Sequence, residues 1–246
     1  MRPIIIIPSR MGSTRLPGKA LMDIHGDPMI VHVWRRGIEA DLGPVIVAAG
    51  DLDIVKTIRD RGGNAILTDP NLPSGSDRAH AALTAADGSG VHDVVVVLQG
   101  DLPTIEPSVV RATLAPLLNN PSCDIGTLAT EIESEEELNL PSVVKIGLSI
   151  VPGTTIGRAL YFSRSPIPAG EGRHYHHVGM YAYRREALSR YVALPRGILE
   201  QRESLEQLRA LENGMRIDVS IIKTEPLGVD TADDLRRAIE LLRPQD

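Results

Sequence analysis

Short apolar runs alternate with helix-length amphipathic segments through the first half of the chain. The runs are rich in Ile and Val and lack the polar alternation of a half-buried strand, which indicates strands covered on both faces. They lie at Pro3–Ile7, Val45–Ala49, Ala65–Leu67 and Val94–Leu98, and the helical patterns at Met29–Glu39, Leu52–Arg61, Asp77–Ala86 and Pro107–Leu118. This alternation predicts an α/β fold with a doubly wound, mostly parallel sheet and right-handed crossovers.

The second half of the chain has a less regular pattern. It predicts strands at Ile125–Ala129, Val143–Ile150, Val178–Tyr183 and Arg216–Lys223, helices at Leu199–Asn213 and Thr231–Leu242, and a loop or lid over 152–176. Thr231 is placed to cap the last helix, and two acidic residues in the first turn favour that helix start. We therefore expect a single domain over 1–246, with a smaller mixed lobe around 125–215.

Composition excludes several classes of protein. A formal net charge of −6 argues against a general nucleic-acid-binding surface. The one cysteine, Cys123, cannot form an intramolecular disulfide or a Cys-based zinc cluster, and we expect it to be a small buried residue rather than a nucleophile. Residues 1–10 do not have the pattern of a signal peptide or a membrane span. We expect a soluble protein of a reducing compartment, without a membrane partner.

A basic, glycine-containing loop follows the first predicted strand. It carries Arg10, Arg15 and Lys19, with Gly12 and Gly18 between them. Ligands of open α/β sheets bind at the carboxyl ends of the strands, so this position favours a phosphate site over a solvated basic loop. The loop does not match a P-loop, because five residues separate Gly12 from Gly18 and Ala20 stands where a Ser or Thr is needed. It also lacks the Gly-x-Gly-x-x-Gly pattern of dinucleotide-binding folds.

Two acidic segments follow other predicted strands. Gln99-Gly100-Asp101 comes directly after Val94–Leu98, and Gly228-Val229-Asp230-Thr231 follows the strand that ends at Lys223. Each has an ordinary structural interpretation, as a turn or as the start of a helix. Together with the basic loop they favour carboxylates that hold Mg²⁺ while the cations neutralise a triphosphate. This combination indicates nucleotidyl transfer.

The segment Ser74-Gly75-Ser76-Asp77-Arg78 allows two interpretations. It has the composition of a helix cap, and it also offers hydroxyl and backbone N–H groups to a base or ribose. The residue types alone do not decide between the two.

Eight segments make the chain similar to the 3-deoxy-manno-octulosonate (Kdo) cytidylyltransferases, also called CMP-Kdo synthetases. They are IPSRMGSTRLPGKAL, GDPMIVHVWRR, SGSDR, VLQGDLP, YFSRSPIP, HVGMYAYRREAL, LEQRESLEQLRALENGMRI and GVDTADDL, in the order of the family and over almost the whole chain. The first segment is shared with other sugar cytidylyltransferases. The YFSR, HVGMY and LEQLR segments are specific to Kdo enzymes.

The resemblance implies a nucleotide-diphospho-sugar transferase-like fold and a reaction. CTP and Kdo would give CMP-Kdo and pyrophosphate, with Mg²⁺ as cofactor, in a cytoplasmic homodimer that serves lipopolysaccharide biosynthesis. Arg10 and Lys19 would grip the triphosphate, Ser74, Gly75, Arg78 and Gly100 would lie near the nucleotide, and Asp101 and Asp230 would hold the metal. The residues implied to meet the sugar acid are Arg15, Gln99, His177, Tyr181, Glu206 and Gln207.

Some of these roles have structural alternatives. Tyr181 can simply pack within its strand, and His177 belongs to a run with His174 and His176 that could lie at the surface. The chain also departs from the family at Leu102, where many relatives have Glu, and in the short segment between Pro168 and His177. The function itself has two alternatives: a cytidylyltransferase for another acidic sugar, such as 8-amino-Kdo or a nonulosonic acid, and a non-catalytic nucleotide-binding regulator.

Overall fold

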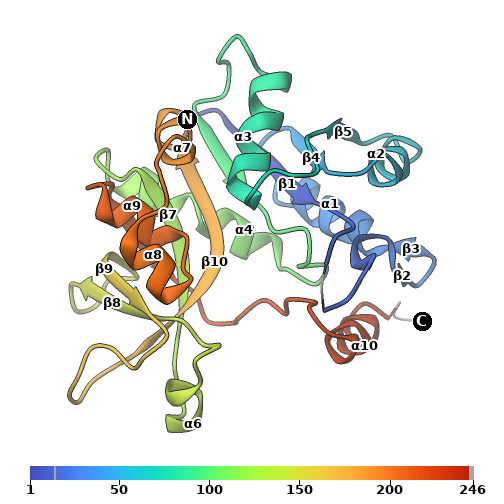
Figure 1. Ribbon diagram of the computed structural model, residues 1–246. Helices are drawn as coiled ribbons and strands as arrows, with labels where there is room; N and C mark the ends of the chain where they lie inside the picture. The colour runs from blue at the N-terminus through green and yellow to red at the C-terminus, as the bar shows by residue number, and fades with distance from the viewer. Residues whose placement is uncertain (14, 244–246) are drawn as a thin grey trace. The chain divides into compact units, whose positions relative to one another are not determined.

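The computed structural model describes residues 1–13 and 15–243 (Figure 1). The chain divides into two compact units. Unit 1 consists of Met1–Arg111 together with the segment that begins at Pro226, and unit 2 consists of Ala112–Glu225. The first unit carries the basic loop and both acidic segments.

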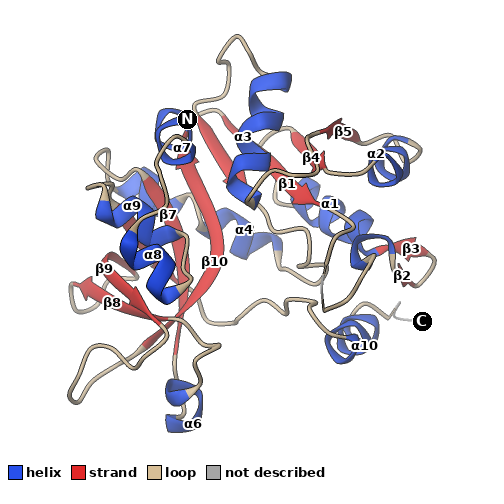
Figure 2. Ribbon diagram, viewed as in Figure 1, coloured by secondary structure: helices blue, strands red, loops and turns tan. Residues whose placement is uncertain are grey.

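Unit 1 contains the four strands predicted from the first half of the sequence. They are β1 Pro3–Ser9, β4 Val45–Ala49, β5 Asn64–Leu67 and β6 Val94–Val97. They pair in parallel in the order β5-β4-β1-β6, and β5, β4 and β1 are labelled in Figure 2. Ile5 lies opposite Val45 on one side and Val96 on the other. Ile4 to Ile7 are almost fully buried, as their unbroken apolar run predicts.

The helices of unit 1 follow the predicted alternation. They are α1 Met29–Glu39, α2 Leu52–Arg59, α3 Gly75–Ala86 and α4 Pro107–Ala112 in the order of the strands, and α10 Ala232–Leu241 near the end of the chain. Helices α1 and α3 pack against β1, and α2 packs against β4 and β5. The α/β fold expected for this part of the chain is therefore confirmed.

Short elements after the basic loop pack against the C-terminal segment of unit 1. They are the 3₁₀ helix η1 Lys19–Leu21 and the two-residue strands β2 Asp23–Ile24 and β3 Asp27–Pro28. Leu16, Ile24 and Met29 form one apolar cluster with Val229 and Ala238 from the C-terminal segment. This burial brings the segment that carries Asp230 against the segment that carries Lys19.

Unit 2 contains a mixed sheet, as expected of the smaller lobe. Its strands are β7 Ile125–Glu131, β8 Lys145–Ile150, β9 Ile156–Ser163, β10 Tyr175–Arg184 and β11 Ile217–Ile221. They lie in the order β10-β7-β11-β9-β8, and β8 also pairs with β10. Only the β7–β11 pair is parallel among the pairs that the described residues form within this unit. Its helices are α5 Ala115–Asn119, α6 Glu135–Asn139, α7 Arg185–Val192, α8 Ile198–Glu203 and α9 Gln207–Glu212.

Two predicted helices are divided into shorter ones. The pattern at Pro107–Leu118 forms α4 and α5, because Pro116 lacks the N–H that a continuous helix would need and its ring clashes with the preceding turn. The pattern at Leu199–Asn213 forms α8 and α9, because Ser204 takes a left-handed conformation with φ of 54°. Apolar spacing did not reveal this break, since apolar residues continue on both sides of it.

The predicted loop at 152–176 was wrong for its first half. Residues Ile156–Ser163 form β9, which pairs with β8 in an antiparallel hairpin. Pro152 and Gly153, two of the residues that suggested a loop, lie in the turn of this hairpin, where the hydroxyl of Thr154 donates to the carbonyl of Val151.

Two further observations concern Cys123 and the helices. Cys123 is fully buried, and burial is the main cause that raises the pKa of its thiol to about 12, so it is not a nucleophile at neutral pH. Within residues 1–13 and 15–243, none of the helices has both the length and the apolar character needed to cross a membrane.

Candidate active site

The basic loop is held by its own backbone and by one acidic residue. The carbonyl of Met11 accepts hydrogen bonds from the amides of Ser13 at 2.9 Å and Gly18 at 3.1 Å. The amide of Met11 donates to Asp51 Oδ2 at 2.8 Å. Gly18 has φ of 72°, a conformation that favours glycine, and it directly precedes η1. This turn directs Lys19 away from the loop and toward the acidic segments.

Lys19 joins the two acidic segments. Its Nζ donates to Asp101 Oδ2 at 2.8 Å, to the carbonyl of Val229 at 2.9 Å and to Asp230 Oδ1 at 3.1 Å. Burial by itself lowers the pKa of Lys19, but the two carboxylates outweigh this and raise the pKa above its usual value. The side chain is therefore a fixed positive charge at the meeting point of the two segments.

The backbone also ties the two acidic segments together. The amide of Val229 donates to the carbonyl of Asp101 at 2.9 Å, and the Val229 side chain is fully buried. Thr231 then caps α10 as predicted, in a reciprocal capping box with Asp234. Asp230 is thus fixed between a buried valine and a capped helix.

Gly100 has a packing reason to be glycine. A Cβ at this position would lie 2.7 Å from the carbonyl oxygen of Pro8, which is closer than real Cβ atoms approach. The absence of a side chain lets the loop after β6 lie against the end of β1. Leu102 directly follows Asp101 and is 8% exposed, so it contributes apolar packing beside that residue.

Arg15 and Arg10 differ in their surroundings. Arg15 Nη2 lies 2.8 Å from Asp230 Oδ2, but its side chain is 66% exposed, so this ion pair contributes little stability. Arg10 is exposed at the end of β1, and after burial its charge is the next cause that lowers the pKa of Arg78. Two guanidinium groups therefore repel each other here, and a bound anion would relieve that repulsion.

The described residues fit a divalent cation. Oxygen atoms from Asp101, Val229 and Asp230 already surround one positive charge, that of Lys19 Nζ. Carboxylate and carbonyl oxygens are the ligands that Mg²⁺ prefers. The role of Asp101 and Asp230 as Mg²⁺ ligands stays a prediction.

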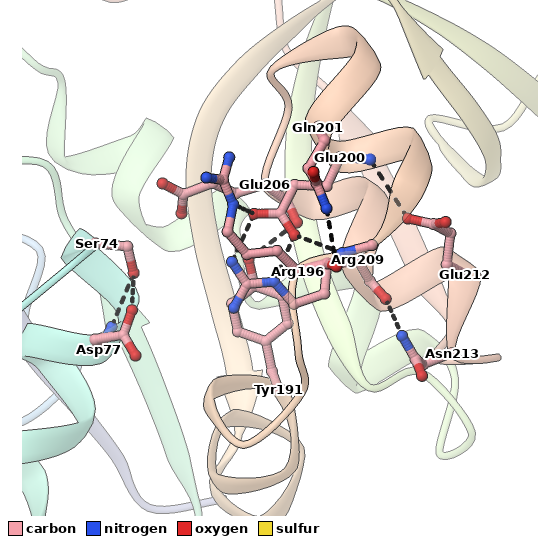
Figure 3. Close-up of polar contacts among 11 residues, drawn as sticks. Ser74, Asp77, Tyr191, Arg196, Glu200, Gln201, Glu206, Arg209, Glu212 and Asn213 are labelled. Atoms are coloured by element: carbon pink, nitrogen blue, oxygen red, sulfur yellow. Dashed lines mark hydrogen bonds and ion pairs between the residues drawn. The ribbon is translucent and has the colours of Figure 1, made fainter.

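The segment at Ser74 has the structural role that was one of its two interpretations. Ser74 caps α3 by accepting from the amide of Asp77, and the two side chains also hydrogen-bond to each other (Figure 3). Arg78 is 3% exposed and donates to Thr68 Oγ1 and to the carbonyls of Asp69 and Pro70. The nucleotide role of Ser74, Gly75 and Arg78 stays a prediction.

His177, in unit 2, is a buried and hydrogen-bonded residue rather than a surface one. Its Nε2 lies 3.1 Å from Thr127 Oγ1 and its Nδ1 lies 3.4 Å from Gln207 Nε2. Burial, and then the charge of His176, lower the pKa of His177 to about 3, so the ring is neutral. Because the amide group of Gln207 donates to Nδ1, the proton of the ring is on Nε2 and points at Thr127. The Thr127 hydroxyl in turn donates to the carbonyl of Met180 at 2.9 Å.

Tyr181 and Glu206 are the more accessible of the sugar residues expected in unit 2. Tyr181 follows an irregularity in the pairing of β10 with β7 and begins a series of rings with Tyr183 and Tyr191, with centroids 5.8 and 5.9 Å apart. Desolvation, and then these two tyrosines and Glu206, raise the pKa of Tyr181 well above its ordinary value. Its hydroxyl therefore remains a hydrogen-bond donor. Glu206 is exposed and directly precedes α9.

Two supporting residues, Gly50 and Thr127, were not predicted from the sequence. Gly50 directly follows β4, and a Cβ there would lie 2.9 Å from Arg78 Nη1 and 3.2 Å from Arg10 Cβ. Its position at a strand end is a signal that could have identified it. Thr127 gave no such signal, because threonine is common in strands and its partner His177 is 50 residues away.

Comparison with known proteins shows the family of the chain. Residues 4–217 match the family model described as Cytidylyltransferase. The 3-deoxy-manno-octulosonate cytidylyltransferase of Paramagnetospirillum magneticum is 56% identical over 243 residues, which cover 99% of this chain and 98% of that protein. The enzyme of the same name from Rhodospirillum rubrum is 57% identical over 240 residues, covering 98% of this chain and 95% of the relative.

A solved structure extends this similarity to the fold. CMP:2-keto-3-deoxy-manno-octonic acid synthetase complexed with CTP matches with a TM-score of 0.88 and 39% sequence identity, over 98% of both chains. The expected nucleotide-diphospho-sugar transferase-like fold is thereby confirmed. With identity above one half over nearly the full length of the curated relatives, the chain belongs to the family of 3-deoxy-manno-octulosonate cytidylyltransferases.

Proposed function

We propose that the protein transfers CMP from CTP to the anomeric hydroxyl of Kdo, which gives CMP-Kdo and pyrophosphate. The observation that carries this proposal is the meeting of Lys19, Asp101 and Asp230 in a chain that is 56% identical to a Kdo cytidylyltransferase over 99% of its length. A non-catalytic regulator would have no need of two carboxylates that converge with a lysine.

The charges of unit 1 suit a nucleoside triphosphate. Arg10 and Lys19 are proposed to bind the triphosphate, and Ser74, Gly75, Arg78 and Gly100 to lie along the nucleotide. Asp101 and Asp230 would hold Mg²⁺, which when bound neutralises phosphate charge and lowers the pKa of a coordinated hydroxyl. Lys19 would then exchange a carboxylate for a phosphate oxygen as its partner.

The bond changes need no covalent intermediate on the protein. The anomeric oxygen of the sugar forms a bond to the α-phosphorus while the bond from that phosphorus to the oxygen shared with the β-phosphorus breaks. That oxygen leaves as part of pyrophosphate, and the proton of the sugar hydroxyl passes to water. Cations placed before the reaction stabilise the charge that moves onto pyrophosphate, and this needs little reorganisation. Catalysis by this chain would therefore come mainly from positioning and from fixed charge.

The sugar acid is proposed to meet Arg15, Gln99, His177, Tyr181, Glu206 and Gln207. The guanidinium of Arg15 suits a carboxylate, and the Tyr181 hydroxyl and the Glu206 carboxylate suit sugar hydroxyls. His177 is neutral and accepts a hydrogen bond from the Gln207 amide. We propose that it orients this amide toward the sugar, in addition to its own proposed contact. The Arg15–Asp230 ion pair would exchange when a sugar carboxylate binds.

The cellular setting is part of the proposal. A requirement for CTP supports a cytoplasmic location, and the family resemblance supports a homodimer and a role in lipopolysaccharide biosynthesis. Light scattering on the purified chain tests the dimer, and a monomer at all concentrations would contradict it.

Release of pyrophosphate tests the function. The purified protein is incubated with CTP, Mg²⁺ and one of several sugar acids: Kdo, 8-amino-Kdo or a nonulosonic acid. We expect the highest kcat/KM with Kdo, and the formation of CMP-Kdo by mass spectrometry. Turnover with another acid but not with Kdo would overturn the choice of sugar, and no turnover with any of them would overturn the choice of reaction.

A further inference from the structure

A buried ion pair joins the two helices on either side of Glu206. Arg209 Nε donates to Glu200 Oε2 at 2.7 Å, and Arg209 Nη2 donates to Glu200 Oε1 at 2.6 Å (Figure 3). Glu200 belongs to α8 and is 1% exposed, and Arg209 belongs to α9 and is 8% exposed. Two parallel hydrogen bonds fix both the distance and the orientation of the helices at this point.

The Glu200 carboxylate is ionised and has further hydrogen-bond donors besides Arg209. Glu200 also accepts from the amide of Gly197 at 3.2 Å and from Arg196 Nε at 3.3 Å. Burial by itself raises the pKa of Glu200, but the hydrogen bonds from Arg209 and Gly197 outweigh it and lower the pKa below its ordinary value. A buried ion pair is weak evidence for stability, since apolar residues often replace one without loss. Its presence here calls for a reason other than stability.

That reason lies in the turn between the helices. Ser204 adopts the left-handed conformation, and the amide of Leu205 donates to the carbonyl of Glu200 at 3.2 Å. The chain reverses within a few residues and presents Glu206 as the residue before α9. The first part of the turn is fixed by the buried side chain of Leu205 and by Arg164, which donates to the carbonyls of Glu203 at 2.8 Å and Ser204 at 3.3 Å. The carbonyl of Glu206 has separate partners.

Tyr191 connects the ion pair to Glu206. The guanidinium carbon of Arg209 lies 5.2 Å from the centroid of the Tyr191 ring, and the Tyr191 hydroxyl donates to the carbonyl of Glu206 at 3.0 Å. The amide of Arg209 donates to the same carbonyl at 3.1 Å. The carbonyl of Glu206 is therefore held by the Tyr191 hydroxyl and by the backbone amide of Arg209, and the Arg209 guanidinium lies over the ring that supplies the first of these bonds (Figure 3).

We propose that Glu200, Arg209 and Tyr191 are positioning residues for the sugar acid, which they serve by fixing the backbone of Glu206. None of the three touches the sugar in this proposal. It rests on the proposed function, in which Glu206 is a sugar contact. Displacement of a contact by about 1 Å is enough to lower the rate by up to 100-fold, so fixing a turn of this kind has a catalytic effect.

The test separates positioning from stability. Glu200→Gln removes the charge that Arg209 faces, and Arg209→Lys keeps the charge but loses the paired hydrogen bonds. We expect each to raise KM for Kdo by about tenfold while KM for CTP stays within about twofold, a split that follows from a displaced sugar contact. Thermal unfolding and the Mg²⁺ dependence of activity are measured on the same samples.

A matched control exists in the same unit. Asp218 on β11 is 2% exposed and accepts from Arg216 Nε at 2.9 Å and from Asn120 Nδ2 at 2.9 Å, so it is also a buried carboxylate paired with arginine. Asp218→Asn should lower the unfolding temperature and leave both KM values unchanged. If Glu200→Gln behaves like Asp218→Asn, the pair is only structural and the proposal is overturned.

Two further variants keep the result interpretable. Tyr191→Phe removes a single hydroxyl and keeps the ion pair, and it should still raise KM for Kdo selectively even if Glu200→Gln does not fold. An unchanged KM for Kdo in Tyr191→Phe would overturn the proposal. Glu206→Gln tests the sugar contact itself: if it leaves KM for Kdo unchanged, the proposed sugar role of Glu206 fails, whatever the other variants do.

Discussion

Asp101 Oδ2 and Lys19 Nζ lie 2.8 Å apart, and the same ammonium reaches Asp230 Oδ1 at 3.1 Å. Lys19 is 82 residues from Asp101 and 211 residues from Asp230 along the chain. The contact is made possible by the short η1 turn after Gly18 and by the burial of Val229, which bring three separate segments to one point.

Asp101→Asn should lower kcat by a factor on the order of 100 to 1000, the size found when one electrostatic contact to a transition state is removed. The fold should persist, because Lys19 keeps Asp230 and the carbonyl of Val229 as partners. Pyrophosphate release and thermal unfolding are the measurements. Asp27→Asn is the control, since Asp27 is paired with Arg35 and Arg61 and has no proposed catalytic role. Activity equal to that of the unmodified protein would remove Asp101 from the catalytic site.

Gly100→Ala should impair the site through the backbone. The new Cβ would meet the carbonyl oxygen of Pro8 at 2.7 Å, so the loop that carries Asp101 must move. We expect kcat/KM for CTP to fall at least tenfold, with destabilisation of about 1–3 kcal/mol as for other overpacked positions. Gly88→Ala is the matched control, because Gly88 is exposed, lies outside the proposed site, and a Cβ there would lie at an ordinary 3.6 Å from the carbonyl oxygen of Thr84. Equal activities of the two variants would show that the close approach at Gly100 has no functional effect.

His177 should make stability depend on pH. Its pKa is about 3 in the folded protein, mainly because of burial, against about 6.5 in an unfolded chain. Between these values the unfolded chain binds a proton that the folded protein does not, so stability is greatest above pH 6.5 and falls as the pH decreases. One proton gives a slope of up to about 1.4 kcal/mol per pH unit.

Urea unfolding between pH 5 and 6.5 measures this slope, in a range where most carboxylates stay ionised. His177→Gln should reduce it, and His25→Gln, at an exposed histidine, should not. A slope that is the same in all three proteins would mean that His177 is protonated in the folded state.

Lys145→Met should strongly destabilise unit 2. The Lys145 side chain is fully buried, and its Nζ donates to the carbonyls of Leu140, Val143 and Arg164 at 2.9, 2.7 and 2.6 Å. Methionine fills the space but leaves these carbonyls without a donor, so we expect a loss of about 3–5 kcal/mol of unfolding free energy. Lys56→Met on the exposed face of α2 is the control. A loss below about 1 kcal/mol would mean that water replaces the ammonium.

Local patterns predicted the regular part of the fold well. The strand Val45–Ala49 and the helix Met29–Glu39 have the bounds that their apolar patterns indicated, because burial on both faces or on one stripe leaves a periodic trace in the sequence. The break at Ser204 and the strand Ile156–Ser163 were not predicted. A serine in the left-handed conformation does not change the spacing of apolar residues, and a hairpin turn that contains Pro and Gly has the composition of a loop.

The sequence by itself determined the order of strands and helices in the first half, the three strand-end segments with catalytic residue types, and the family. These properties depend on residue type and local spacing, so they can be read along the chain. Only the tertiary structure decided that Lys19 lies between Asp101 and Asp230, that His177 is buried with both ring nitrogens bonded, and that Arg209 pairs with Glu200 across the turn that holds Glu206. Those contacts depend on how distant segments bury their apolar residues together, and no local pattern records which distant side chain will be the partner.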